Sequence, residues 1–95
     1  MDLKAGNFME SRKIHNRISV LRKERNISRK ELASEIGVNY QTIGYLERGE
    51  YNPSLDLAFK ISEYFDLPVE LIFSPKPLKP LSEELRELQH NTPEG

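Results

Sequence analysis

The chain has 95 residues, of which 37% are hydrophobic and 31% charged, a composition that suits one small globular domain. It contains no cysteine, which excludes disulfide bonds and thiolate chemistry. No run of about 18 apolar residues predicts a membrane span, and residues 1–13 lack the apolar stretch of a secretion signal. We therefore expect a cytoplasmic protein without a membrane partner.

Charge is distributed unevenly along the chain, although the formal net charge is only −1. Between Arg12 and Lys30, eight basic residues stand against one acidic residue. Between Glu31 and Pro75, eight acidic residues stand against two basic ones. Such asymmetry permits a basic face on a nearly neutral protein, and a basic face is typical of proteins that bind nucleic acids.

Apolar residues recur at helical spacing through most of the chain, and no segment alternates in the way of a half-buried strand. We therefore predict an all-α domain of five helices. The first is expected over about residues 14–25. The second begins at Ser28, which can form an S-x-x-E capping box with Glu31, and Gly37 can end it in the left-handed conformation.

The third predicted helix covers about residues 40–48, between a cap at Asn39 and a terminating glycine at Gly49. An Asn-Pro turn follows, after which Ser54 can cap a fourth helix. Pro68 suits the first turn of a short fifth helix that closes the core. These five elements form one compact block.

The two ends of the chain carry less pattern than this block. We expect residues 1–11 to be a flexible tail, residues 12–75 the folded domain, and residues 76–95 a proline-rich linker with an amphipathic tail. Three leucines of the tail, at i, i+4 and i+7, predict a short extra helix. Three roles remain open for this helix: pairing in a dimer, docking onto the same chain, or disorder in isolation.

The second and third predicted helices are separated by only about three residues. Two helices joined so tightly can cross closely only where a small side chain separates them, and Ala33 meets that need. Counting from Ala33, Gly37 follows four residues later, Ile43 ten later and Leu46 thirteen later. This spacing indicates a DNA-binding helix-turn-helix, and it is far more specific than a lone glycine or a basic patch.

The segments "LRKERNISRKELASEIGV", "QTIGYLERG", "NPSLDLAFKI" and "LPVELIF" extend the pattern over residues 17–74. Over this range the chain resembles the phage repressor and Cro family of helix-turn-helix regulators. The resemblance implies that the third helix enters the major groove of double-stranded DNA, the docking mode described for phage repressors themselves. On this chain the base-reading positions are then Tyr40, Gln41 and Tyr45. By residue type alone, these three side chains could also be ordinary solvent-facing residues.

The resemblance also implies contacts to the DNA backbone, which fix the position of the protein on the duplex. The residues at these positions are Ser28, Arg29, Tyr51 and Asn52. Asn39 and Thr42 could add hydrogen bonds to the DNA backbone or to a neighbouring base. Arg22 and Glu47 match a pair that holds the reading helix in place in some phage repressors. Glu50 departs from the family pattern, because a basic or neutral residue is commoner there and a carboxylate is repelled by phosphates.

The chain offers little for catalysis. His15 and His90 lie far apart in the sequence, and no serine has a base to activate it. We therefore predict no enzyme activity, no metal and no cofactor. The expected function is that of a sequence-specific transcriptional regulator, a repressor that binds its operator as a homodimer. The alternative is a protein-interaction module of the same fold, such as an antitoxin or an adaptor that captures a protein partner.

Overall fold

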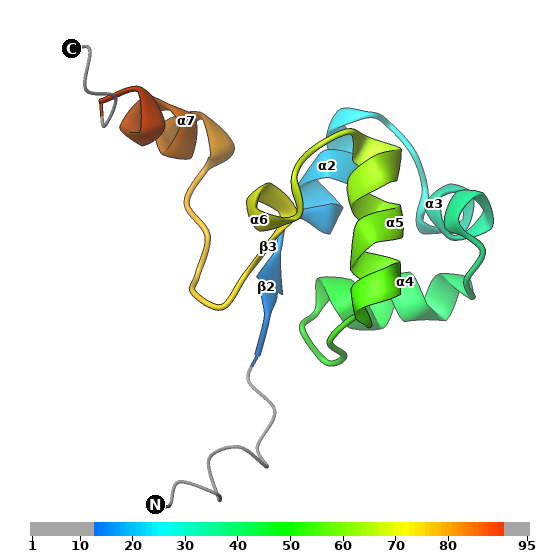
Figure 1. The fold of residues 1–95 in the computed structure, drawn as a ribbon. Coiled ribbons are helices and arrows are strands. Elements are labelled where there is room, and N and C mark those ends of the chain that lie inside the picture. Colours follow the sequence, from blue (N-terminus) through cyan, green and yellow to red (C-terminus); the bar gives the residue numbers. More distant parts are fainter. Residues whose placement is uncertain (1–12, 91–95) are drawn as a thin grey trace, which may run out of the picture.

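A computed structural model describes residues 13–90 of the chain (Figure 1). Its elements, in chain order, are β2 (His15–Asn16), α2 (Ile18–Glu24), α3 (Arg29–Ile36), α4 (Tyr40–Glu47), α5 (Leu55–Phe65), α6 (Val69–Ile72), β3 (Phe73–Ser74) and α7 (Leu81–His90). The predicted all-α fold is confirmed, with one pair of two-residue strands added to it. The tail expected at residues 1–11 lies outside the described part. No helix within residues 13–90 is long and apolar enough to span a membrane.

The prediction that the first helix begins near Ile14 is wrong. Residues 15–16 are extended and form β2, which pairs antiparallel with β3. The side chain of Asn16 explains the later start, because its Oδ1 accepts a hydrogen bond from the backbone N–H of Ile18, at 3.0 Å. Its Nδ2 donates to the carbonyl of Leu46, at 2.7 Å, and so ties this strand to the end of α4. Ile14 packs against the core from the segment that precedes β2. Its apolar side chain therefore continued the helical spacing of the sequence, although the residue is not in a helix.

A single hydrophobic core joins α2 through α6 and β3. The largest fully buried side chains are Phe65, Ile18, Leu32, Ile43, Leu46, Ile61 and Ile72. Burying one such side chain stabilises the fold by roughly 1.5–3 kcal/mol. A helix as short as α4 is unstable alone in water, so the burial of Ile43 and Leu46 holds it in place.

The ends of the helices follow the predicted caps. The Ser28 hydroxyl accepts from the backbone N–H of Glu31 at 3.0 Å, and the Glu31 carboxylate accepts from the backbone N–H of Ser28 at 2.8 Å. Gly37 ends α3 at φ +78°, in the left-handed region that favours glycine. Asn39 and Ser54 each accept a backbone hydrogen bond at the start of α4 and α5. These local contacts leave α3 and α4 joined by a three-residue turn.

The predicted extra helix forms as α7, at one side of the helical body and away from α4 (Figure 1). The buried guanidinium of Arg17, a residue only 4% exposed, donates to the carbonyls of Leu71 and Lys79 and pairs with Glu84 on α7. Lys79 pairs with Glu87, and this hydrogen bond raises the pKa of Lys79 above its usual value. Arg17 thereby fastens Lys79 and Glu84 to the folded domain, while the pair between Lys79 and Glu87 lies within the C-terminal segment.

Candidate nucleic-acid interface

The turn between α3 and α4 sets the direction of α4. The carbonyl of Ala33 accepts hydrogen bonds from the backbone N–H groups of Gly37 and Val38, at 2.8 and 3.0 Å. Ala33 itself is buried among the core residues that α3 and α4 share. Because Ile43 and Leu46 point inward, the opposite face of α4 is turned to solvent.

The three residues predicted to read bases lie on this outer face. Tyr40 and Tyr45 are each 46% exposed, and Gln41 is exposed between them. A cation lies over each tyrosine ring: the Lys30 ammonium is 5.3 Å from the ring centre of Tyr40, and the Arg48 guanidinium is 5.3 Å from that of Tyr45. Such contacts are worth roughly 0.5–1 kcal/mol at exposed sites. They place one positive charge beside each of the two exposed tyrosine rings.

Arg48 is a component of the outer face that the sequence left unassigned. Its guanidinium, together with that of Arg29, lies over the backbone of Gly44: a Cβ at Gly44 would be 3.2 Å from Arg48 Nη1 and 3.7 Å from Arg29 Nη1. The missing side chain therefore makes room for two guanidinium groups, at a helix cost of about 1 kcal/mol relative to alanine. The i, i+4, i+7 spacing of Gln41, Tyr45 and Arg48 is the signal that could have placed Arg48 here.

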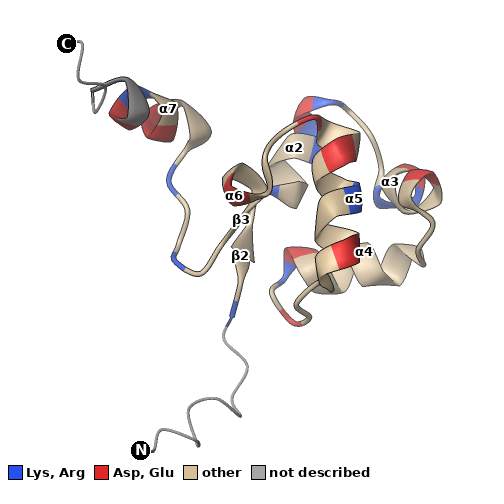
Figure 2. Cartoon of the chain, viewed as in Figure 1, with Lys and Arg blue, Asp and Glu red and all other residues tan. Residues whose placement is uncertain are grey.

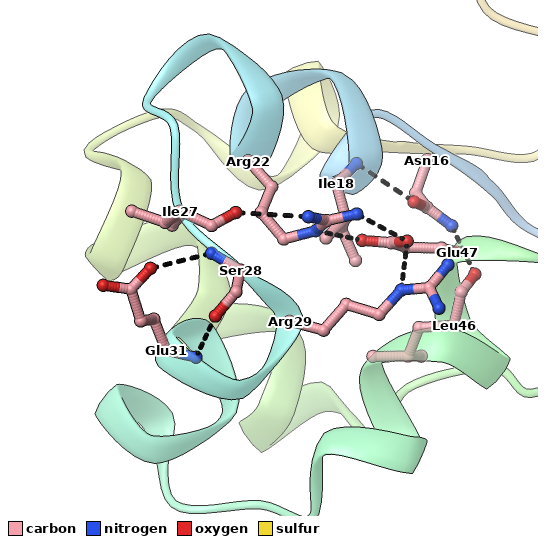
Figure 3. A network of polar contacts seen from close by, with 9 residues as sticks. All are labelled: Asn16, Ile18, Arg22, Ile27, Ser28, Arg29, Glu31, Leu46 and Glu47. Atoms are coloured by element: carbon pink, nitrogen blue, oxygen red, sulfur yellow. Dashed lines mark hydrogen bonds and ion pairs between the residues drawn. The ribbon is translucent and has the colours of Figure 1, made fainter.

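Glu47 connects three helices at the edge of this face (Figure 3). Arg22 donates from Nε to Oε2 of Glu47 at 2.8 Å and from Nη2 to Oε1 at 3.3 Å. Arg29 donates from Nε to Oε1 at 3.0 Å, and Arg22 also donates to the carbonyl of Ile27 at 3.1 Å. Only 4% of the Glu47 side chain is exposed. Because the three residues come from α2, α3 and α4, they fix the position of α4.

Arg29, which the sequence assigned to the DNA backbone, is thus partly engaged within the protein. Its Nε is bonded to Glu47, while 44% of its side chain remains exposed. An arginine has five N–H donors in a fixed arrangement, so one group can bond a carboxylate and still face an outside anion. The structure therefore gives Arg29 a structural contact in addition to its expected one.

The other predicted backbone contacts divide into two groups. Ser28 and Asn39 use their side-chain oxygens to cap α3 and α4. This places both residues at helix N-termini, where backbone N–H groups and the helix dipole favour an anion. Thr42 and Asn52 are half-buried, while Tyr51 is 47% exposed. The structure brings Thr42 and Tyr51 together at one shallow notch, which Tyr45 and Glu50 also line.

The basic stretch before residue 30 does not form one continuous basic face. Arg17 bonds the C-terminal segment, Arg22 bonds Glu47, and Arg25 donates to the carbonyls of Tyr64 and Phe65 at 3.3 and 2.7 Å. Figure 2 shows that α4 itself is uncharged along most of its length. In the folded domain, these three arginines bond groups of the protein itself, and the surface carries basic and acidic residues side by side.

Comparisons with known proteins identify the family of the chain. A helix-turn-helix family model matches residues 18–72. An uncharacterized HTH-type transcriptional regulator of Archaeoglobus fulgidus is 45% identical over 60 residues, which cover 63% of this chain and 84% of the relative. Another, from Methanocaldococcus jannaschii, is 43% identical over 58 residues, or 61% of this chain and 88% of the relative.

Two solved structures have a similar fold. The structure of a transcriptional regulator from Listeria innocua matches with a TM-score of 0.55 and 26% identity, covering 78% of this chain and 71% of that one. A protein from Bacteroides fragilis matches with a TM-score of 0.58 and 26% identity, covering 64% of this chain and 98% of its own. The chain, as its motifs predicted, belongs to the helix-turn-helix family of the Cro and phage repressor type.

Proposed function

We propose that the protein is a sequence-specific transcriptional regulator that inserts α4 into the major groove of its operator. The observation that carries the proposal is the outer face of α4, where exposed Tyr40, Gln41 and Tyr45 project from a helix that is fixed by core packing and by Glu47. A helix held this firmly presents its side chains in one arrangement, which direct readout of base edges requires. The names of the relatives support the same assignment.

In this proposal Gln41 pairs with an adenine, because its amide offers one donor and one acceptor to N7 and N6. The ring edges of Tyr40 and Tyr45 can contact thymine methyl groups, and their hydroxyl groups can bond a base or a DNA phosphate. The N-termini of α3 and α4 approach the DNA backbone, together with Arg29. These contacts to phosphates position the protein, while Gln41 supplies discrimination of roughly 1–3 kcal/mol.

We further propose that the protein represses transcription as a homodimer. One domain of this size buries little surface on DNA, and two copies bound to half-sites about 10 bp apart would double the contacts. A repressor that occupies an operator needs no further domain for its effect.

A protein-interaction role is the second candidate, and one observation favours it. Leu85 of α7 is 44% exposed, on a helix that lies away from α4 (Figure 1). Salt dependence separates the two candidates. Each phosphate neutralised steepens the fall of log K with log salt by about 0.9, so DNA binding predicts a slope of several units. An interaction module has no such requirement for duplex DNA.

The decisive experiment is selection of bound duplexes from a random library at moderate salt, for the unchanged protein and for Gln41→Ala. We expect the unchanged protein to enrich an inverted repeat. Gln41→Ala should lose preference at one base pair of each half-site and keep most of its non-specific binding. Equal loss of binding to all duplexes would contradict the role of Gln41, and no enrichment by the unchanged protein would contradict the proposed function.

A further inference from the structure

Beside the predicted base-reading residues lies a notch with a chemistry of its own. It has a volume of about 360 Å³ and is lined by Thr42, Tyr45, Glu50 and Tyr51. Tyr45 and Thr42 project from α4 within one turn of Gln41, so the notch opens on the same side of the protein. The walls are largely two half-exposed tyrosine rings, and the only ionised lining group is the carboxylate of Glu50.

The carboxylate of Glu50 is paired with Arg48 at the surface. Arg48 Nε lies 3.2 Å from Glu50 Oε2, and the same guanidinium lies over the ring of Tyr45. A chain of three groups therefore links the carboxylate to the wall of the notch. Arg48 also supplies a positive charge next to Glu50, which offsets the repulsion between that carboxylate and DNA phosphates. Glu50 can thus approach a groove that would repel an isolated carboxylate.

An ionised carboxylate can only accept hydrogen bonds. In the major groove, guanine O6 and thymine O4 are acceptors and would face it with lone pairs. Adenine N6 and cytosine N4 are donors, but adenine also presents its N7 acceptor beside N6. Cytosine alone presents a donor without an acceptor, next to an apolar C5 edge. A notch lined by one carboxylate and two tyrosine side chains is complementary to that edge.

We propose that this notch reads a cytosine, with Glu50 accepting a hydrogen bond from N4 while Tyr45 and Tyr51 flank the C5 edge. The inference rests on the proposed function, because it requires α4 to lie in the major groove. It assigns to Glu50, whose charge disagrees with the family pattern, a role in specificity. It also makes Arg48 a positioning residue that acts through Glu50.

The test compares the motifs that the unchanged protein, Glu50→Gln and Glu63→Gln select from a random duplex library. Glu63 is exposed on the last turn of α5, at the end remote from α4, so its variant is a control for loss of one negative charge. We expect Glu50→Gln to lose about tenfold preference for cytosine at one position of the half-site, because glutamine can also donate to guanine or thymine. Glu63→Gln should keep that preference.

Failure of this inference can be distinguished from failure of the proposed function. If the unchanged protein enriches no motif, the proposed function fails and the inference fails with it. If Glu50→Gln selects the same motif with uniformly tighter binding, Glu50 acts only through its charge and the notch reads no base. A preference for adenine at the position that depends on Glu50 would likewise overturn the assignment to cytosine.

A second variant addresses the walls of the notch. Tyr51→Ala removes one flanking ring, and we expect it to weaken the cytosine preference at the same position as Glu50→Gln. Thermal unfolding of each variant shows whether the domain is intact. Because the side chains of Glu50 and Tyr51 are both about half exposed, we expect little change in the unfolding midpoint. If a folded Tyr51→Ala protein keeps the full preference, the notch is not the reading site.

Discussion

Replacing Glu47 by glutamine tests whether one buried carboxylate holds the reading helix in place. The side chain keeps its size and one acceptor oxygen, but it loses the charge that faces Arg22 and Arg29. Three hydrogen bonds to charged groups, at 2.8, 3.3 and 3.0 Å, end on this carboxylate. The side chain of Arg22 is only 12% exposed. In the Glu47→Gln variant, little water could therefore solvate its positive charge in place of the lost carboxylate.

Breaking one side of a buried ion pair costs roughly 3–5 kcal/mol of unfolding free energy. The pair with Arg29 contributes little to this value, because a side chain 44% exposed is solvated without its partner. We therefore expect Glu47→Gln to lose about 3 kcal/mol, the lower end of the range. For a domain of this size, that corresponds to a fall of about 12–24 °C in the midpoint of thermal unfolding.

Thermal and urea unfolding, followed by circular dichroism, measure this effect. Lys60→Gln is the matched control, because it breaks the exposed pair between Lys60 and Asp56 and should change stability by less than about 0.5 kcal/mol. The double variant Arg22→Met with Glu47→Leu should recover most of the loss, since apolar side chains can replace a buried ion pair. A loss below about 1 kcal/mol for Glu47→Gln would refute the structural role of this carboxylate.

Three further predictions concern the frame around the reading helix. Ala33→Leu overpacks the core between α3 and α4 and should lower the unfolding free energy by about 1–3 kcal/mol; an unchanged urea midpoint would place the helix crossing elsewhere. Gly37→Ala meets no atom within 4 Å but must hold φ near +78°, so urea unfolding should show a loss of about 1–2 kcal/mol from backbone strain alone. Arg17→Met removes the donor to three acceptors, and limited proteolysis should then cleave residues 75–80 faster than in Lys76→Gln; equal rates would show that Arg17 does not fasten this segment.

The sequence predicted the parts of the fold that depend on neighbouring residues. Ser28 and Gly37 act within one turn of their own positions, so the capping box and the turn could be read directly. The apolar spacing of α3 and α4 likewise predicted which face is buried. The two strands could not be predicted this way, because β2 and β3 are separated by most of the domain and each has only two residues.

The candidate site shows the same division between local and distant contacts. Tyr40, Gln41 and Tyr45 were assigned as reading residues by the family resemblance, and the inward positions of Ile43 and Leu46 in the helical spacing leave them on the outer face. The involvement of Arg29 with Glu47 depends on how α3 crosses α4, which no local pattern specifies. The position of Arg48 over Gly44 depends on a missing side chain, and a glycine within a helix does not indicate by itself what lies above it.

The contacts of Arg17 have a consequence for the order of events during synthesis. Its guanidinium bonds groups on Leu71, Lys79 and Glu84, which leave the ribosome after every core helix from α2 to α5. Burying a charged group before its acceptors exist costs several kcal/mol, so a nascent chain that ends near Phe65 keeps Arg17 in water. The four earlier helices can collapse together, but the β2 end of the domain closes only when residues 71–84 have been made. Completion of the native state is therefore tied to the synthesis of residues 71–84.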